Sequence, residues 1–325
     1  MSRSAKAQLL LVFITFLWGA TFVIVKSVLG SISPLLFNAA RMVLAAGLLV
    51  AIFARHLKSL SWDALRAGSL VGFFLGLGYT FQTTGLRITT PSKSAFITGL
   101  YVILVPIFLA IGWRRIPNRW TLLGVMACLA GLYLMTIPAG SGGTWSFDLS
   151  RVNGGDLLTL ACAASFALHI IFLGRAMQRF SFEQISVLQI VACAILMFAL
   201  VPLSRQTYVT WSARVVGAIA VTAVLCTVLA FTLQAWAQQY TSPAQTALIF
   251  VLEPVFAGLT SYVVLGERLG LRATLGAALI LAGILLSELR SPCEESEREI
   301  EPSTSIVEEQ NGGSAKRITA ESRLK

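Results

Sequence analysis

The 325-residue chain is 56% hydrophobic and only 12% charged, and its mean hydropathy is +0.78. Soluble domains carry about 25% charged residues, so this composition excludes an ordinary soluble protein and predicts an all-α polytopic membrane protein. The net charge of +10 comes without a run of Lys or Arg and without basic residues interleaved with aromatics, which argues against a nucleic-acid partner.

Ten apolar segments are long enough to cross a bilayer, whose core of about 30 Å needs about 20 residues per helix. In chain order they are 8–29, 34–54, 67–87, 91–112, 119–137, 155–174, 183–203, 214–237, 244–265 and 271–289. The first has a short basic start, but its apolar stretch exceeds a signal peptide's and lacks an A-x-A cleavage site, so we expect it to be retained.

A Gly- and Ser-rich connecting loop, 138–153, divides the predicted spans five and five. The sequence therefore predicts a first five-helix repeat at 8–137 and a second at 154–289. The polar segment 290–325 holds eight of the fifteen acidic residues and has too little apolar surface to offset the entropy of ordering, so we predict a disordered C-terminal tail.

The two predicted repeats are related by an offset of 152 residues. Between 89 and 134, eleven of forty-six positions match their partners at that offset, including Pro91 with Pro243 and Gly131 with Gly283. An odd number of spans per repeat makes the second copy enter the membrane from the opposite side, which predicts inverted repeats. Lys and Arg in the first half's loops favour both termini on the cytoplasmic side.

Three ionisable residues lie at membrane depth, Arg41, His169 and Glu253, and such residues usually mark a functional site. Glu253 follows Pro243 by ten residues, which places it about 15 Å into its helix, at the bilayer midplane. Pro254 lacks an amide hydrogen and interrupts helical bonding, which is tolerated at this depth only against protein or a wet cavity. We therefore predict a helix break and gating element at Glu253 and Pro254.

Polar and aromatic residues of the other spans form stripes that converge on a central substrate cavity between the repeats. The residues predicted to line it are Trp18, Arg41, Tyr79, Gln82, Thr98, Tyr101, His169, Gln189, Gln234 and Glu253. Structural roles remain open for several of them. Gln82 and Gln234 can bridge helices, His169 and Trp18 can be packing residues, and Glu253 can hold the broken helix together.

Four segments resemble the EamA family of the drug/metabolite transporter superfamily: LWGATFVIVKSVL (17–29), NAARMVLAAGLL (38–49), TTPSKSAFITGLYVILVP (89–106) and TSPAQTALIFVLEPVFAGLTSYVVLGERL (241–269). The resemblance covers about residues 8–289. The matching motif positions are Trp18 and Gly19 (WG), Arg41, Glu253 and Pro254 (EP), and Gly266 and Glu267 (GE). The first half departs from the pattern, because Arg114 and Arg115 stand where the second half has GE.

The resemblance implies ten spans in two inverted repeats, cytoplasmic termini, and transport of small metabolites such as amino acids, usually as export in bacteria. Together with the polar stripes, it predicts a secondary transporter of the cytoplasmic (inner) membrane that moves a small, amphipathic, amino-acid-like metabolite by alternating access. Proton coupling through Glu253 is left open, because a carboxylate at membrane depth can bind and release a proton.

The alternatives from other classes are a channel and, less favoured, a membrane-embedded enzyme. A channel needs a ring of like groups around a pore, whereas an internal inverted repeat favours a carrier. No HExxH, GxSxG or P-loop motif occurs. The five Cys are scattered without CxxC or a metal-like spacing with His, so we expect no cofactor, no metal and no enzymatic activity.

Overall fold

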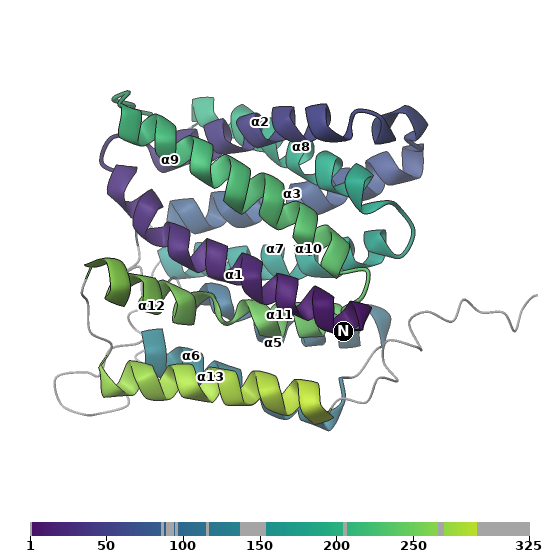
Figure 1. The fold of residues 1–325 in the computed structure, drawn as a ribbon, viewed down its shortest axis with the longest axis vertical. Helices are drawn as coiled ribbons and strands as arrows, with labels where there is room; N and C mark the ends of the chain where they lie inside the picture. Colours follow the sequence, from purple (N-terminus) through teal and green to yellow (C-terminus); the bar gives the residue numbers. More distant parts are fainter. Residues whose placement is uncertain are drawn as a thin grey trace, which may run out of the picture. The chain divides into compact units, whose positions relative to one another are not determined.

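In the computed structural model, the described residues are 2–85, 88, 94, 97–114, 117–136, 154–203, 207–265 and 270–290. Figure 1 shows that they are built almost entirely from helices that lie side by side. The helices are α1 (Arg3–Val28), α2 (Pro34–Phe53), η1 (His56–Ser59), α3 (Trp62–Gly85), α5 (Tyr101–Trp113), α6 (Arg119–Thr136), α7 (Gly154–Met177), α8 (Phe182–Leu200), η3 (Val201–Leu203), α9 (Ala213–Ala223), η4 (Val224–Leu229), α10 (Ala230–Ala237), α11 (Pro243–Phe250), α12 (Glu253–Leu265) and α13 (Leu271–Arg290). The connecting loop 138–153, the tail 291–325 and the Gly266–Glu267 motif lie outside the described residues.

The chain is an all-helical membrane protein. Within its described part, six helices are long and apolar enough to cross a membrane, and three shorter apolar helices accompany them. Helix α3 begins at Trp62, five residues before the predicted span, and the hydroxyl of Ser61 accepts from the amide of Ala64 in its first turn at 3.1 Å. Trp62 is 73% exposed there, and Asp63 lies near the positive end of the helix dipole.

Helices α6 and α13 form an antiparallel pair through glycines (Figure 1, bottom). A Cβ built on Gly124 would lie 2.7 Å from the carbonyl oxygen of Gly283, and one built on Gly131 would meet the carbonyl of Gly276. Cys128 Sγ donates to the carbonyl of Ile280, its partner at the 152-residue offset, at 3.5 Å. Small residues are what allow two membrane helices to approach this closely.

The ninth membrane segment is interrupted. Helix α11 ends at Phe250, residues 251–252 form a turn, and α12 begins at Glu253. Pro254 is thus the second residue of α12, where first-turn amides have no intrahelical acceptor and a missing N–H is harmless. The break lies directly before the Glu253–Pro254 pair.

The eighth membrane segment is irregular at its centre. A π-helical turn, η4, separates α9 from α10 and lies at residues 224–229. Thr227 stabilises it, because its buried hydroxyl donates to the carbonyl of Thr222, five residues earlier, at 3.1 Å. Turns of this type occur frequently at functional sites. The irregular parts of the eighth and ninth segments both face α1, which contacts η4, α11 and α12.

Two loops from different halves of the chain pair at one end of the bundle. Ile32 and Val209 form an isolated antiparallel bridge. The amide of Ser33 donates to the carbonyl of Tyr208 at 2.9 Å, and the amide of Thr210 donates to the carbonyl of Ser31 at 2.7 Å. The α1–α2 connection is therefore tied to the segment that precedes α9.

Candidate functional site: a central cavity

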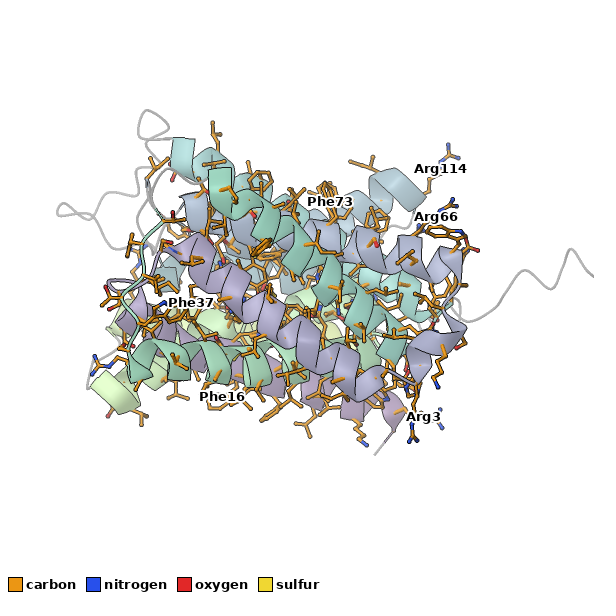
Figure 2. The ribbon with its side chains drawn as sticks, turned by 90° about the horizontal axis from the view of Figure 1, so that it is seen from above. Arg3, Phe16, Phe37, Arg66, Phe73 and Arg114 are labelled. Carbon is orange, nitrogen blue, oxygen red and sulfur yellow. The ribbon has the colours of Figure 1, made fainter. Side chains whose placement is uncertain are left out.

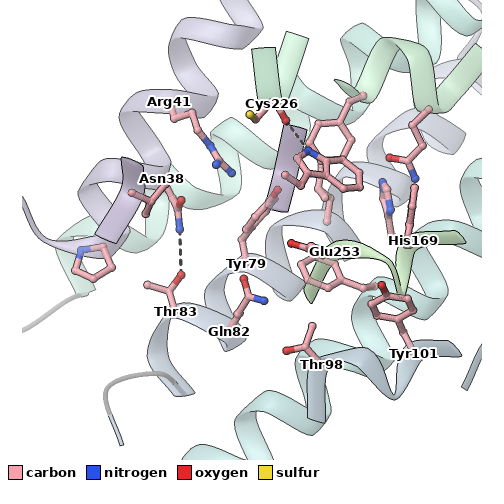
Figure 3. A pocket seen from close by; sticks show the side chains of 18 of the residues that line it. Asn38, Arg41, Tyr79, Gln82, Thr83, Thr98, Tyr101, His169, Cys226 and Glu253 are labelled. Atoms are coloured by element: carbon pink, nitrogen blue, oxygen red, sulfur yellow. Dashed lines mark hydrogen bonds between the residues drawn. The ribbon is translucent and has the colours of Figure 1, made fainter. Parts of the chain in front are cut away.

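A cavity of about 320 Å³ lies among the helices of both halves. Its walls include Leu29 and Pro34 at one end and residues near mid-helix, such as Trp18 and Ile170, at the other. Figure 3 shows side chains from several helices pointing into this space. The volume is within the range of small-molecule sites, about 300–1,000 Å³.

Trp18 and Gly19 connect helix α1 to both irregular helices. The indole Nε1 of Trp18 donates to the carbonyl of Cys226, inside η4, at 3.0 Å. The Trp18 ring lies 5.0 Å from the ring of Phe250, the last residue of α11. Gly19 lies against the start of α12, where an added Cβ would be 2.8 Å from the carbonyl oxygen of Glu253. The WG pair thus contacts the π-turn and the helix break together.

Arg41 brings a guanidinium group to the cavity wall from α2. The residue is only 7% exposed, and its Nε and Nη2 atoms are buried without a hydrogen-bond partner among the described residues. Its Cζ lies 4.9 Å from the ring centroid of Tyr79, so the guanidinium stacks on an aromatic face. Asn38, one turn earlier, donates through Nδ2 to the hydroxyl of Thr83 at 3.0 Å (Figure 3).

Glu253 places a carboxylate at the centre of the cavity (Figure 3). It is the first residue of α12, so its position follows from the break and its charge lies near the positive end of the α12 dipole. Within the described part of the chain, the lone ion pair within 4.0 Å joins His56 to Glu183, and it does not involve Arg41 or Glu253. The two charges of the cavity are therefore not paired with each other.

A buried polar network borders the cavity on the side of α7. His169 Nε2 lies 3.0 Å from Gln189 Oε1. Gln234 donates to Gln238 Oε1 at 3.2 Å, and Gln238 donates to the carbonyl of Ile170 at 3.0 Å. These bonds hold His169 and Gln234 in place while both still line the cavity.

The structure brings together all of the predicted cavity residues except Gln189, which lies behind His169 and does not line the space. Sequence reasoning missed several lining residues, chiefly Phe37, Asn38, Phe166, Cys226 and Phe231. Asn38 carried a usable signal, because it lies one turn before Arg41 on the same face of α2. The aromatic residues carried none, since apolar side chains are common throughout these helices.

The described ranges contain no group of three or more His, Cys, Asp or Glu side chains that could hold a metal ion. The free cysteines at 128, 162, 193 and 226 are buried and dispersed. The cavity is lined instead by one guanidinium, one carboxylate, one imidazole, one thiol, amides, hydroxyls and aromatic rings. Groups of these kinds are able to bind and orient a small molecule.

Comparisons with known proteins relate the chain to membrane transporters. The EamA-like transporter family matches residues 5–137 and 153–289. An uncharacterized transporter of Archaeoglobus fulgidus is 33% identical over 284 residues, which cover 87% of this chain and 86% of that protein. The uncharacterized transporter YoaV of Bacillus subtilis is 26% identical over 294 residues, covering 87% and 96%.

A protein of known crystal structure superimposes with a TM-score of 0.73 at 19% identity, covering 91% of this chain and 99% of that one, and it shares the fold. The two matches to one family domain indicate an internal duplication. The chain thus belongs to the EamA-like transporter family and is a multi-pass membrane transporter with two EamA domains.

Proposed function

We propose that the protein is a secondary carrier that moves a small, amphipathic, amino-acid-like metabolite across the cytoplasmic membrane by alternating access. The observation that carries this proposal is a central cavity that extends toward one end of the bundle. Its lining runs from Trp18 on α1 to Leu29, directly after that helix, and from Pro34 to Arg41 on α2. It stops at Ile170 on α7 and at Gln234 on α10.

The opposite end of the bundle is filled by packed side chains. Ala7, Leu11 and Ile14 of α1 are buried there in one hydrophobic cluster with Ala237 of α10. A carrier in one of its end states is expected to have a site that is reached from one side and closed on the other. A channel would instead need a continuous path lined by like groups.

The contacts of α6 and α13 support two inverted repeats. Residues 124 and 131 correspond to 276 and 283 at the 152-residue offset. In the structure, Gly124 packs on Gly283 and Gly131 packs on Gly276, so each contact is matched by its symmetry equivalent. Equivalent helices that cross antiparallel are what a two-fold axis in the membrane plane produces.

The two irregular helices supply joints for the required motion. Residues 251–252 interrupt the ninth segment and the π-turn 224–229 interrupts the eighth. The π-turn contacts Trp18, and the start of α12 contacts Gly19. Glu253 and Pro254 would therefore serve as the bending point of the ninth segment, with α12 moving relative to α11.

Basic residues support an orientation with both termini in the cytoplasm. Arg3, Arg66 and Arg114 lie at the same end of the bundle (Figure 2), as expected for loops that stay inside. In this orientation the cavity extends toward the outside. Export as the physiological direction rests on the resemblance to the family rather than on geometry.

Counterflow in proteoliposomes tests the proposal. Vesicles that contain the purified protein are loaded with a panel of unlabelled amino acids, one at a time, and the uptake of the same labelled compound is followed. A carrier gives saturable uptake that is accelerated by internal substrate. Flux that rises linearly with concentration and shows no acceleration by internal substrate would indicate a channel. Chemical conversion of the compound would indicate an enzyme.

A further inference from the structure

Among the described residues, the guanidinium of Arg41 has no anionic partner within 4.0 Å. Glu253 is the one acidic residue among the described residues that line the cavity, and no ion pair within 4.0 Å joins the two. A charged group that is more than nine-tenths buried is strongly destabilising when it is unpaired. The Nε and Nη2 atoms have no hydrogen-bond partner in the described structure either. This site is incomplete unless an anion binds to it.

The surroundings of Arg41 hold its guanidinium ready for a ligand. Stacking on the Tyr79 ring at 4.9 Å restricts the plane of the group. Its Nε and Nη2 atoms, which have no partner in the described structure, remain available to donate in-plane hydrogen bonds to a ligand. Asn38, one turn earlier on α2, directs its amide nitrogen to the hydroxyl of Thr83. Since a guanidinium presents a fork of donors that matches a carboxylate, the geometry favours bidentate binding of that group.

The remainder of the cavity suits an apolar body attached to the carboxylate. Trp18 lies 5.0 Å from Phe250 and 5.5 Å from Phe231 between ring centroids, and all three rings line the cavity. Phe166, 5.6 Å from Tyr79, adds a fourth ring. Aromatic walls of this kind offer large apolar contact areas to a flat or branched side chain.

We infer that Arg41 binds the carboxylate of the transported molecule, with Tyr79 as the residue that positions the guanidinium. The substrates are then small organic carboxylic acids with an apolar or aromatic body, amino acids included. This inference rests on the proposed carrier function and deepens it, because it identifies the group that the cavity recognises.

Ligand binding to the purified protein tests this assignment separately from transport. Shifts of the thermal unfolding midpoint are titrated with L-phenylalanine, L-leucine and 3-phenylpropionate, each compared with its uncharged carboxamide at the acid group. We expect acids to bind the wild type at least about tenfold more tightly than the amides, as lost charge-assisted hydrogen bonds predict. In Arg41→Gln the acids and their amides should bind with nearly equal affinity. Arg41→Lys should still bind the acids more tightly than the amides, but with weaker affinity than the wild type.

Arg272→Gln is the matched control, because Arg272 also stacks on a tyrosine ring, with its Cζ 5.4 Å from the centroid of Tyr133, but does not line the cavity. It should bind acids as the wild type does. The inference is overturned if wild type binds the amides as tightly as the acids, if it binds none of the acids, or if Arg41→Gln retains the preference. The comparison of acids with amides on the wild type decides the question even if Arg41→Gln does not fold.

The two proposals fail in different ways. Selective binding of acids without counterflow would refute the carrier and leave the role of Arg41 intact. Saturable counterflow that treats acids and amides alike would refute the role of Arg41 and leave the carrier intact.

Discussion

Gly19 of α1 lies directly against the backbone of Glu253: a Cβ built on Gly19 would be 2.8 Å from the Glu253 carbonyl oxygen and 2.9 Å from the amide nitrogen of Ala257. Cβ atoms do not approach carbonyl oxygens and amide nitrogens this closely, so α1 can pack against the start of α12 only at a residue that has no side chain. The WG and EP motifs, 234 residues apart in the chain, are therefore two halves of one contact.

Gly19→Ala should force α1 away from the start of α12. We expect a loss of about 1–3 kcal/mol of stability, typical of overpacking in a dense core, together with slower transport. The thermal midpoint and the initial rate of counterflow measure the two effects. Gly47→Ala on α2 is the control, since a Cβ there meets nothing within 4 Å, and it should leave the rate unchanged. Equal behaviour of the two variants would show that the contact is unimportant.

Trp18→Phe keeps a ring near Phe250 but removes the donor to the carbonyl of Cys226. The loss of this hydrogen bond should cost about 0.5–1.5 kcal/mol, so the thermal midpoint should fall and the π-turn should be altered. Trp62→Phe, at a residue 73% exposed, should show neither effect. A wild-type midpoint and counterflow rate in Trp18→Phe would mean that the bond to Cys226 has no part in shaping η4.

Glu253→Gln removes a cavity charge that has no ion-pair partner within 4.0 Å in the described structure. Because an unpaired charge at membrane depth is costly, the variant should be as stable as the wild type or more stable. Its counterflow should nevertheless be at least about tenfold slower, equivalent to ~1.4 kcal/mol. Glu183→Gln at the surface pair with His56 should transport normally. A less stable variant with normal transport would instead assign Glu253 a structural role.

Proton coupling through Glu253 has its own test. Uptake in proteoliposomes is compared with and without an imposed proton gradient, for the wild type and for Glu253→Gln. If the carboxylate carries the coupled proton, the variant loses the response to the gradient but still exchanges substrate. A variant that keeps full gradient-driven uptake would exclude this residue as the coupling group.

Gly124→Ala and Gly283→Ala should be destabilising, and their effects should not add. Each Cβ would meet the other glycine's carbonyl at 2.7 Å, so either substitution alone pushes α6 and α13 apart by about the same amount. We expect about 1–3 kcal/mol for each single variant and a double variant that costs clearly less than the sum. Thermal or denaturant unfolding of the four proteins measures the coupling. Gly112→Ala, with nothing within 4 Å of its Cβ, should be neutral. Full additivity would contradict a shared contact.

The sequence predicted the helical membrane fold and the position of the break because those features depend on quantities that a sequence displays. Apolar length defines a span, and Pro254 marks a point where one helical hydrogen bond is lost. The π-turn at 224–229 escaped prediction, since the segment VLCTVL contains no proline or glycine and depends on Thr227 bonding to the carbonyl of Thr222.

Gln189 illustrates a different limit. Its depth along α8 can be estimated by counting residues, but the direction in which it points depends on the rotation of the helix, which is fixed by packing. Gly72 of α3 packs closely on this part of α8, because a Cβ on Gly72 would meet the carbonyl of Gln189 and the side chain of Ala192. In this packing the side chain of Gln189 bonds to His169 and does not line the cavity.

The bridge between Ile32 and Val209 restricts how the protein can open at that end. Besides the two backbone hydrogen bonds of the paired loops, the hydroxyl of Tyr208 donates to the carbonyl of Leu29 at 2.8 Å. Three hydrogen bonds arranged along one line oppose a sliding of the two loops past each other more than they oppose a rotation about that line. In the carrier proposed above, we expect these two loops to stay paired while the two halves of the chain rotate about them.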